Sequence, residues 1–294
     1  MIDVSGKVYD PVGYCIYCNV TESPDGLPLS DEHIVPEGMG GTLVLPSASC
    51  SVCRDITSAF ERNFQRDMYG PTRAFWRLYG KRRKKERPES FPVEVDHRMR
   101  TVDAALDEYP YILVMPLLDP PGLLFDRPIN PYEFPDLRQP GRLWRWKLND
   151  ADSRAQQLLN KHAAENIYPS QRIYLTDFFK MIAKIAHGFA IAQKGYNPAV
   201  RYLLPGLIRA PKGAVTNGAT YLVGTAHNQN GTRVVVAPTT AACNLSVMIA
   251  TPPDLLHQIV TVRVQLFAWL GTPVYEAVVY RFPPIIGQKL ARNP

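Results

Sequence analysis

Cysteine and long apolar runs are scarce in this chain. Only 5 of its 294 residues are cysteine, too few for the dense cross-linking of a small secreted scaffold. No apolar run reaches the roughly 20 residues that a helix needs to cross a bilayer, so we expect no membrane span. The first ten residues, MIDVSGKVYD, lack the basic and then apolar pattern of a secretory leader. We therefore expect a cytoplasmic protein.

Internal repeats are missing as well, and the charge is only moderately unbalanced. Hydrophobic residues make up 46 % of the chain and charged residues 20 %, proportions that suit one large or two modest globular domains. The net charge of +6 favours polyanionic partners such as nucleic acid. Proline occurs 27 times and clusters in the middle of the chain, which indicates long ordered loops there.

The most informative motif of the sequence lies near the N-terminus and consists of two Cys-x-x-Cys pairs. Cys15 with Cys18 and Cys50 with Cys53 use four of the five cysteines. Each pair places two thiolates on one tight turn, and two such turns supply the four sulfurs of a closed tetrahedral zinc site. The spacing exceeds the roughly 15–20 residues of an ordinary zinc ribbon, so the loop can carry a working element. Two disulfides are the weaker alternative. We predict a structural zinc ion.

The loop between the cysteine pairs carries the sequence LSDEHIVPEGMGG. Residues 29–35 predict a strand, and the two glycines at positions 40 and 41 can turn the chain back into a second strand over residues 42–45. Neighbouring side chains of a strand face opposite ways. Glu32 and His33 can therefore serve one site only at a strand end or a bulge, and Pro36 marks such an end.

The composite pattern CxxC…DEHIVP…GG…CxxC, followed by ITSAFE, resembles the HNH or ββα-metal endonucleases. The resemblance covers Cys15 to about Glu61. It implies a β-hairpin and a following helix that hold one divalent metal, usually magnesium, with Glu32 as a metal ligand and His33 as the general base that activates water. The residue types suit this chemistry, because an imidazole titrates near neutral pH and a carboxylate is a hard ligand for magnesium.

The sequence departs from the family pattern directly after the fourth cysteine. The usual asparagine or histidine is replaced by Arg54, which is followed by Asp55. Asp55 could ligate the divalent metal, and Arg54 could instead hold the scissile phosphate, since a guanidinium matches phosphate oxygens. The resemblance thus implies a metal-dependent endonuclease that cuts phosphodiester bonds of nucleic acid, with DNA as the leading substrate. The alternative is a catalytically inactive, zinc-dependent protein that binds nucleic acid without cutting it.

A run of positive charge follows this segment, at Lys81, Arg82, Arg83, Lys84 and Lys85. Five adjacent cations repel one another and should be exposed. They could clamp nucleic-acid phosphates in a salt-sensitive and sequence-independent manner, or they could form a solvated loop. We expect phosphate binding.

The remainder of the chain predicts helices and antiparallel strands. Apolar spacing indicates helices over residues 54–68, 72–78, 151–168 and 176–193. In the last of these, Lys180, Lys184 and His187 share one flank, for which solvent is the favoured environment. Strands are expected over 111–118, 142–148, 221–225, 232–238, 245–250, 259–268 and 274–282. The alternation in 259–266 predicts one buried and one wet sheet face.

These elements together predict an α+β protein. We expect a zinc-stapled ββα module in residues 1–80, a basic and proline-rich connection in 81–150, and an accessory domain in 151–294 whose end is mostly antiparallel β. The accessory domain carries no catalytic constellation. Substrate positioning, partner binding and homodimer formation are all open roles for it.

Overall fold

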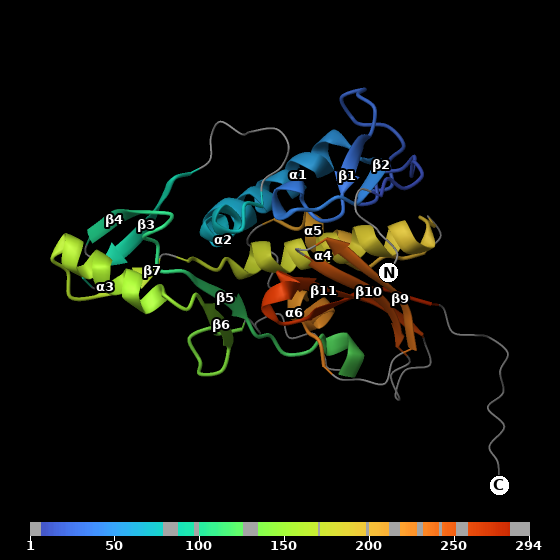
Figure 1. The fold of residues 1–294 in the computed structure, drawn as a ribbon. Coiled ribbons are helices and arrows are strands. Elements are labelled where there is room, and N and C mark those ends of the chain that lie inside the picture. Colours follow the sequence, from blue (N-terminus) through green and yellow to red (C-terminus); the bar gives the residue numbers. More distant parts are fainter. Residues whose placement is uncertain are drawn as a thin grey trace, which may run out of the picture.

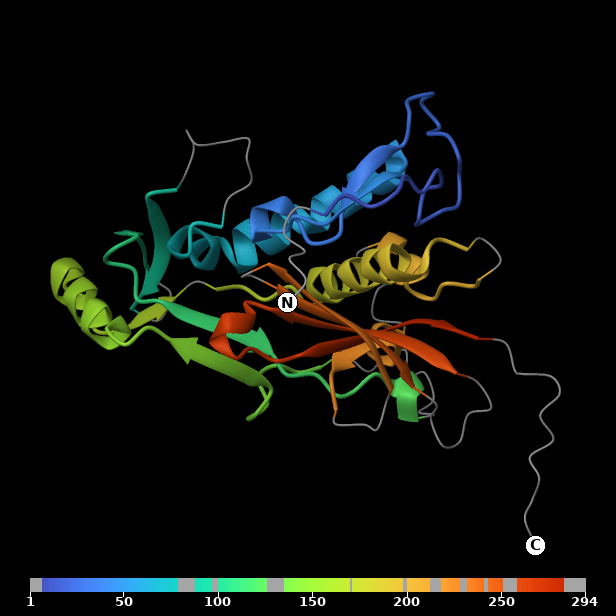
Figure 2. The same ribbon diagram turned by 45° about the vertical axis from the view of Figure 1, so that its right-hand side comes forward.

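A long helix, α4 (Leu175–Lys194), lies between the two main parts of the molecule (Figure 1). The computed structural model describes residues 7–78, 88–96, 100–125, 135–169, 171–197, 200–211, 218–227, 232–240, 243–250 and 258–282. Every residue of α4 from Asp177 to Ile191 is buried. A helix that is covered all round belongs in a core, and α4 contacts α1 on one side and the C-terminal sheet on the other. Figure 2 confirms this layering from a second direction.

The N-terminal segment forms an antiparallel hairpin followed by a helix. Strand β1 (Ser30–His33) pairs with β2 (Val44–Ser49), and a short 3-10 turn, η1 (Glu37–Met39), lies between them. Helix α1 (Ser51–Asn63) follows at once and continues as a π-helical turn, η2 (Phe64–Met68), before α2 (Gly70–Phe75). The predicted first strand and helix are confirmed, whereas the second strand begins later than predicted.

The return of the hairpin depends on a close backbone approach at Gly41. A Cβ atom at this position would lie 1.9 Å from the carbonyl oxygen of Val35. The preceding Gly40 ends η1 in the left-handed conformation, with φ of 77°, a region that glycine enters without a steric penalty. The two glycines therefore let the chain reverse tightly after β1.

The C-terminal part is a five-stranded antiparallel sheet in the order β8-β12-β11-β10-β9. Its strands are β8 (Val223–Thr225), β9 (Thr232–Thr240), β10 (Cys243–Ala250), β11 (Ile259–Leu266) and β12 (Tyr275–Arg281). All five match predicted strands, although residues 219–222 form a short helix, α6 (Ala219–Leu222), where a strand was expected to begin.

The predicted wet face of β11 holds only in part, because Arg263 and Gln265 are partly exposed but Thr261 is not. Thr261 is fully buried, and its hydroxyl donates to the carboxylate of Glu276 on the neighbouring strand β12 at 2.7 Å. Arg263 approaches the same carboxylate at 3.6 Å. Thr261 and Glu276 therefore pair with each other under cover, because a buried polar group must find a partner.

The stretch from residue 88 to residue 169 contains more sheet than its sequence suggested. Its strands are β3 (Ser90–Val95), β4 (Arg100–Ala105), β5 (Ile112–Pro116), β6 (Leu143–Lys147) and β7 (Ile167–Pro169), and its helix is α3 (Ala151–His162). The order β4-β3-β7 makes one sheet and β5-β6 another. Pro92 is tolerated in β3 because β7 pairs only with Val93 to Val95. Helix α3 stops at Ala163 in the left-handed conformation, so the predicted helix to residue 168 is too long.

One hydrophobic core joins these parts. Its largest cluster includes residues of the cysteine knuckles, α1, α4, the short helix α5 (Leu204–Arg209) and the five-stranded sheet. The predicted division at residues 80 and 150 stays a prediction, but the N-terminal hairpin does not bury its apolar face alone. Within the described residues, no helix combines the length and the apolar character needed to span a bilayer.

Candidate metal centre and adjacent polar pocket

The four cysteines of the two pairs come together in space. The sulfur atoms of Cys15, Cys18, Cys50 and Cys53 all lie within 4.8 Å of one another, and those of Cys18 and Cys50 are 3.6 Å apart. That separation is far beyond the roughly 2.05 Å of a disulfide. Sulfurs bound to one zinc at about 2.3 Å would stand about 3.8 Å apart in a tetrahedron. The set therefore fits a metal ion such as zinc.

Local backbone geometry places these sulfurs. The amide of Asn19 donates to Cys15 O, and Asn19 takes the left-handed conformation, with φ of 67°. This tight turn brings Cys15 and Cys18 to the same side. Cys50 is the residue directly before α1, and Cys53 follows in its first turn. The two pairs are aligned because the amide of Ile16 donates to Ala48 O of β2 at 2.9 Å.

Glu32, the predicted metal ligand, points into the interior and meets a lysine. Its carboxylate lies 2.7 Å from Nζ of Lys184, and Glu61 of α1 lies 2.9 Å from the same nitrogen. Lys184 also donates to the carbonyl oxygen of His33. Burial alone would lower the pKa of Lys184, but the two carboxylates outweigh it and raise that pKa above its usual value. All three donor positions of the ammonium are thus used, and Lys184 is the cation of this cluster.

His33 ends β1 and turns the other way from Glu32. A bulge interrupts the pairing between Ser30 and Glu32, yet Glu32 is buried and His33 is half-exposed. Burial and then the Lys184 charge lower the pKa of His33, so its imidazole is neutral near pH 7. Its Nδ1 atom is covered and makes no hydrogen bond within the described structure. A proton from solvent or substrate would therefore have to reach the ring at Nε2.

Asp55 does not join Glu32 and His33. It lies on the exposed side of α1, where its carboxylate is 3.4 Å from Nε of Arg54, and 75 % of its side chain is accessible. In the described part of the chain, the four cysteines are the one compact group of metal-binding side chains. The residues predicted to hold magnesium are thus engaged elsewhere, Glu32 with Lys184 and Asp55 with Arg54, and they do not fit a shared ion.

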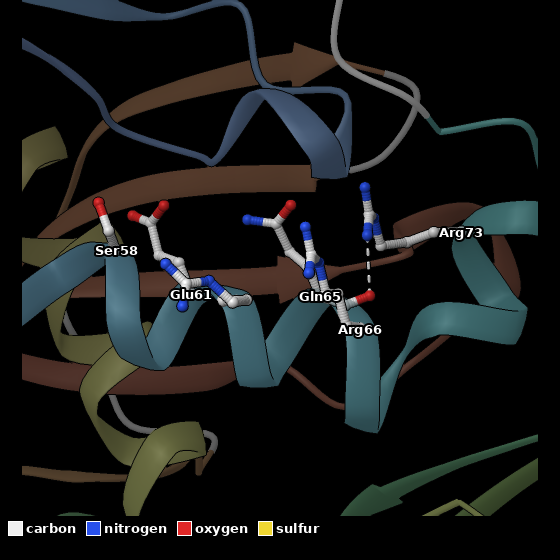
Figure 3. Close-up of a pocket in the computed structure, with 6 residues that line it drawn as sticks. Ser58, Glu61, Gln65, Arg66 and Arg73 are labelled. Carbon is white, nitrogen blue, oxygen red and sulfur yellow. Dashed lines mark hydrogen bonds between the residues drawn. The ribbon is translucent and has the colours of Figure 1, made fainter. Parts of the chain in front are cut away.

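A polar pocket of about 290 Å³ lies beside this cluster (Figure 3). Its lining comes from α1, η2 and α2 and consists of Ser58, Glu61, Arg62, Gln65, Arg66 and Arg73. Arg73 donates to the backbone carbonyls of Gln65, at 2.9 Å, and of Gly38. It thereby ties the turn after β1 to the helical wall. Arg62 and Arg66 are exposed, and no carboxylate of the described residues pairs with them.

The sequence pattern did not predict that α4 contributes several residues to the site. Lys180, Lys184 and His187 are all buried, so their predicted solvent-facing flank is wrong. Lys180 donates to the backbone oxygen of Ala210, and Nε2 of His187 is 2.6 Å from the carbonyl oxygen of Ile16 in the first knuckle. Burial lowers the pKa of His187 to about 4. The regular three- and four-residue spacing of these polar residues on an otherwise apolar helix was the available signal.

No family model, curated protein or solved structure matches this chain. The resemblance to HNH endonucleases over Cys15–Glu61 therefore stays a prediction, and the function has to be inferred from the residues of the site. The basic run at residues 81–85, which was predicted to bind phosphate, lies outside the described residues.

Proposed function

We propose that this protein is an HNH-type nuclease that hydrolyses phosphodiester bonds of nucleic acid, with DNA as the first substrate to test. Four cysteines would bind a structural zinc ion and hold the β1–β2 hairpin against α1. The observation that carries the proposal is His33. It stands half-exposed at the end of β1, and Lys184 connects its carbonyl oxygen to Glu61 of the pocket wall.

The chemistry follows from these groups alone. The imidazole of His33 would take a proton from the attacking water molecule while the new oxygen–phosphorus bond forms. Arg62 and Arg66 would face the phosphate, since guanidinium groups match its oxygens in bidentate geometry. The pocket holds one carboxylate, that of Glu61, against the three guanidinium groups of Arg62, Arg66 and Arg73. The pocket is therefore cationic overall and suited to an anion.

A second function, binding of nucleic acid without cleavage, is favoured by one observation. The carboxylate of Glu32 is occupied by Lys184, and Asp55 is turned to solvent beside Arg54. A chain that had lost its catalytic ion could keep the zinc-held hairpin and the arginine pocket as a surface for phosphates. Such a protein would bind in a salt-sensitive manner, because each phosphate contact releases counterions.

The test compares cleavage of plasmid DNA and of single-stranded RNA by the wild type and by His33→Ala. Loss of a general base should slow cleavage by about 10²–10⁴-fold. The matched control is His227→Ala, which removes an exposed histidine and should cut like the wild type. Equal rates for wild type and His33→Ala would remove His33 from the mechanism.

The second function is separated from the first by measuring binding in the same preparations. Fluorescence anisotropy over a range of salt concentrations should show weaker binding and a shallower salt dependence for Arg62→Gln with Arg66→Gln. Salt-sensitive binding with no cleavage of either nucleic acid would select the binding function. Unchanged binding by the double variant would exclude the pocket as the phosphate site.

A further inference from the structure

The buried cluster of Glu32, Glu61 and His33 O is built for a hard cation. Two carboxylates, one from β1 and one from α1, converge with a backbone carbonyl on a single point. Carboxylate and carbonyl oxygens are the ligands that magnesium and calcium take from proteins. The point on which they converge holds the ammonium nitrogen of Lys184.

Lys184 cannot leave this position easily. Only 1 % of its side chain is accessible, and it belongs to the middle of α4, where every residue from Asp177 to Ile191 is buried. If a divalent ion took the place of the ammonium between the two carboxylates, the Lys184 ammonium would stay buried next to that ion. Both the loss of its partners and the repulsion between like charges oppose such an exchange.

We propose that Lys184 is a built-in cation that takes the place of a divalent metal ion between Glu32 and Glu61. Lys184 thereby also acts as a positioning residue, because its bond to the carbonyl oxygen of His33 holds the end of β1. The link to catalysis rests on the proposed nuclease function, whereas the identity of the bound cation does not. It follows that phosphodiester cleavage at His33 proceeds without magnesium.

Every proton and bond of such a reaction can be accounted for without a metal ion. A water molecule gives one proton to the imidazole of His33 as its oxygen bonds to phosphorus. The bond from phosphorus to the leaving oxygen breaks, and that oxygen takes a proton from solvent or from the imidazolium. The guanidinium groups of Arg62 and Arg66 lie where they can offset the charge on the other phosphate oxygens.

The experiment titrates the zinc-loaded protein with Mn²⁺ and follows the free ion by electron paramagnetic resonance. The wild type and Glu32→Gln should bind Mn²⁺ equally weakly. Lys184→Met should gain affinity by about tenfold or more, the scale on which one neighbouring group alters a metal site, and adding Glu32→Gln to it should abolish the gain. Binding by the wild type that Glu32→Gln removes would overturn the proposal, even if Lys184→Met does not fold.

A cleavage assay in buffers freed of magnesium by a chelating resin separates this inference from the proposed function. Cleavage at the same rate with and without added magnesium supports the built-in cation. A strict requirement for magnesium overturns it. If no preparation cleaves nucleic acid but the Mn²⁺ pattern is as expected, the proposed function fails and the assignment of Lys184 stands.

Discussion

Removal of the Lys184 ammonium should be among the most destabilising single changes in this protein. The substitution Lys184→Met keeps an unbranched apolar side chain but leaves Glu32 and Glu61 without their shared cation. Breaking a buried pair by removing one partner costs about 3–5 kcal/mol, because the remaining charge is buried and uncompensated. Here two carboxylates lose the same partner, so we expect the upper part of that range.

The chain offers a matched control for burial. Lys161 lies 2.7 Å from Glu108, the same separation as between Lys184 and Glu32, but 53 % of the Lys161 side chain is accessible against 1 % for Lys184. An exposed pair of this kind contributes about 0–1 kcal/mol. Lys161→Met should therefore change the free energy of unfolding by no more than about 1 kcal/mol, although the distance is identical.

The assay is urea unfolding of the zinc-loaded protein, followed by circular dichroism, for both variants and for Lys184→Met combined with Glu32→Gln. The amide that Glu32→Gln introduces carries no charge, so the combination should recover part of the stability lost by Lys184→Met. The reasoning that the cluster is a buried ion network would be refuted by two results together. Lys184→Met and Lys161→Met would lower the free energy of unfolding by the same small amount, and the combination with Glu32→Gln would recover none of it.

Three further predictions concern the cysteines, α4 and the hairpin turn. Zinc analysis should find one ion per chain in the wild type and in the control Cys243→Ser. Cys50→Ser should retain no zinc after dialysis, since closed four-sulfur sites need every ligand. Retention of zinc by Cys50→Ser would exclude the four-cysteine site. The pKa of His187 is about 4 in the folded protein against 6.5 unperturbed, so its contribution is complete above pH 6.5 and is lost as the pH falls toward 4. The loss is about 3 kcal/mol, and His187→Gln should flatten the fall of unfolding free energy between pH 7 and 4; an unchanged slope would contradict the burial of a neutral ring. In thermal unfolding, Gly41→Ala should destabilise the protein by about 1–3 kcal/mol because a Cβ would meet a backbone oxygen at 1.9 Å. The control Gly206→Ala, which has open space around it, should be neutral or slightly stabilising.

Local patterns of the sequence were sufficient for most single elements. The alternation in residues 259–266 and the apolar spacing in residues 176–193 gave β11 and α4 nearly at their observed bounds. The strands β3 and β4 escaped notice because Pro92 and charged residues hide their alternation. They form only because they pair with each other and with β7, which lies far away in the chain. Pairing of that kind is a long-range property that no local window contains.

The environment of polar residues was the least predictable feature. Lys184 and His187 look like the solvated flank of a helix, and the polar positions of β11 look like a wet face. Lys184 and His187 are buried against the N-terminal segment, which supplies their partners, whereas Thr261 finds its partner, Glu276, on the neighbouring strand of its own sheet. Whether a charged residue on an amphipathic element meets water or a buried carboxylate depends on what packs against it, and hydropathy within the element does not record this.

The sequence by itself determined the four-cysteine cluster, because each Cys-x-x-Cys turn is a local structure and only two such turns exist to be joined. It also determined the order of hairpin and helix that frames His33. Only the tertiary structure decided which cation Glu32 meets. Lys184 reaches the end of β1 from 151 residues further along the chain, and it does so because the apolar faces of α1 and the C-terminal sheet enclose α4 between them.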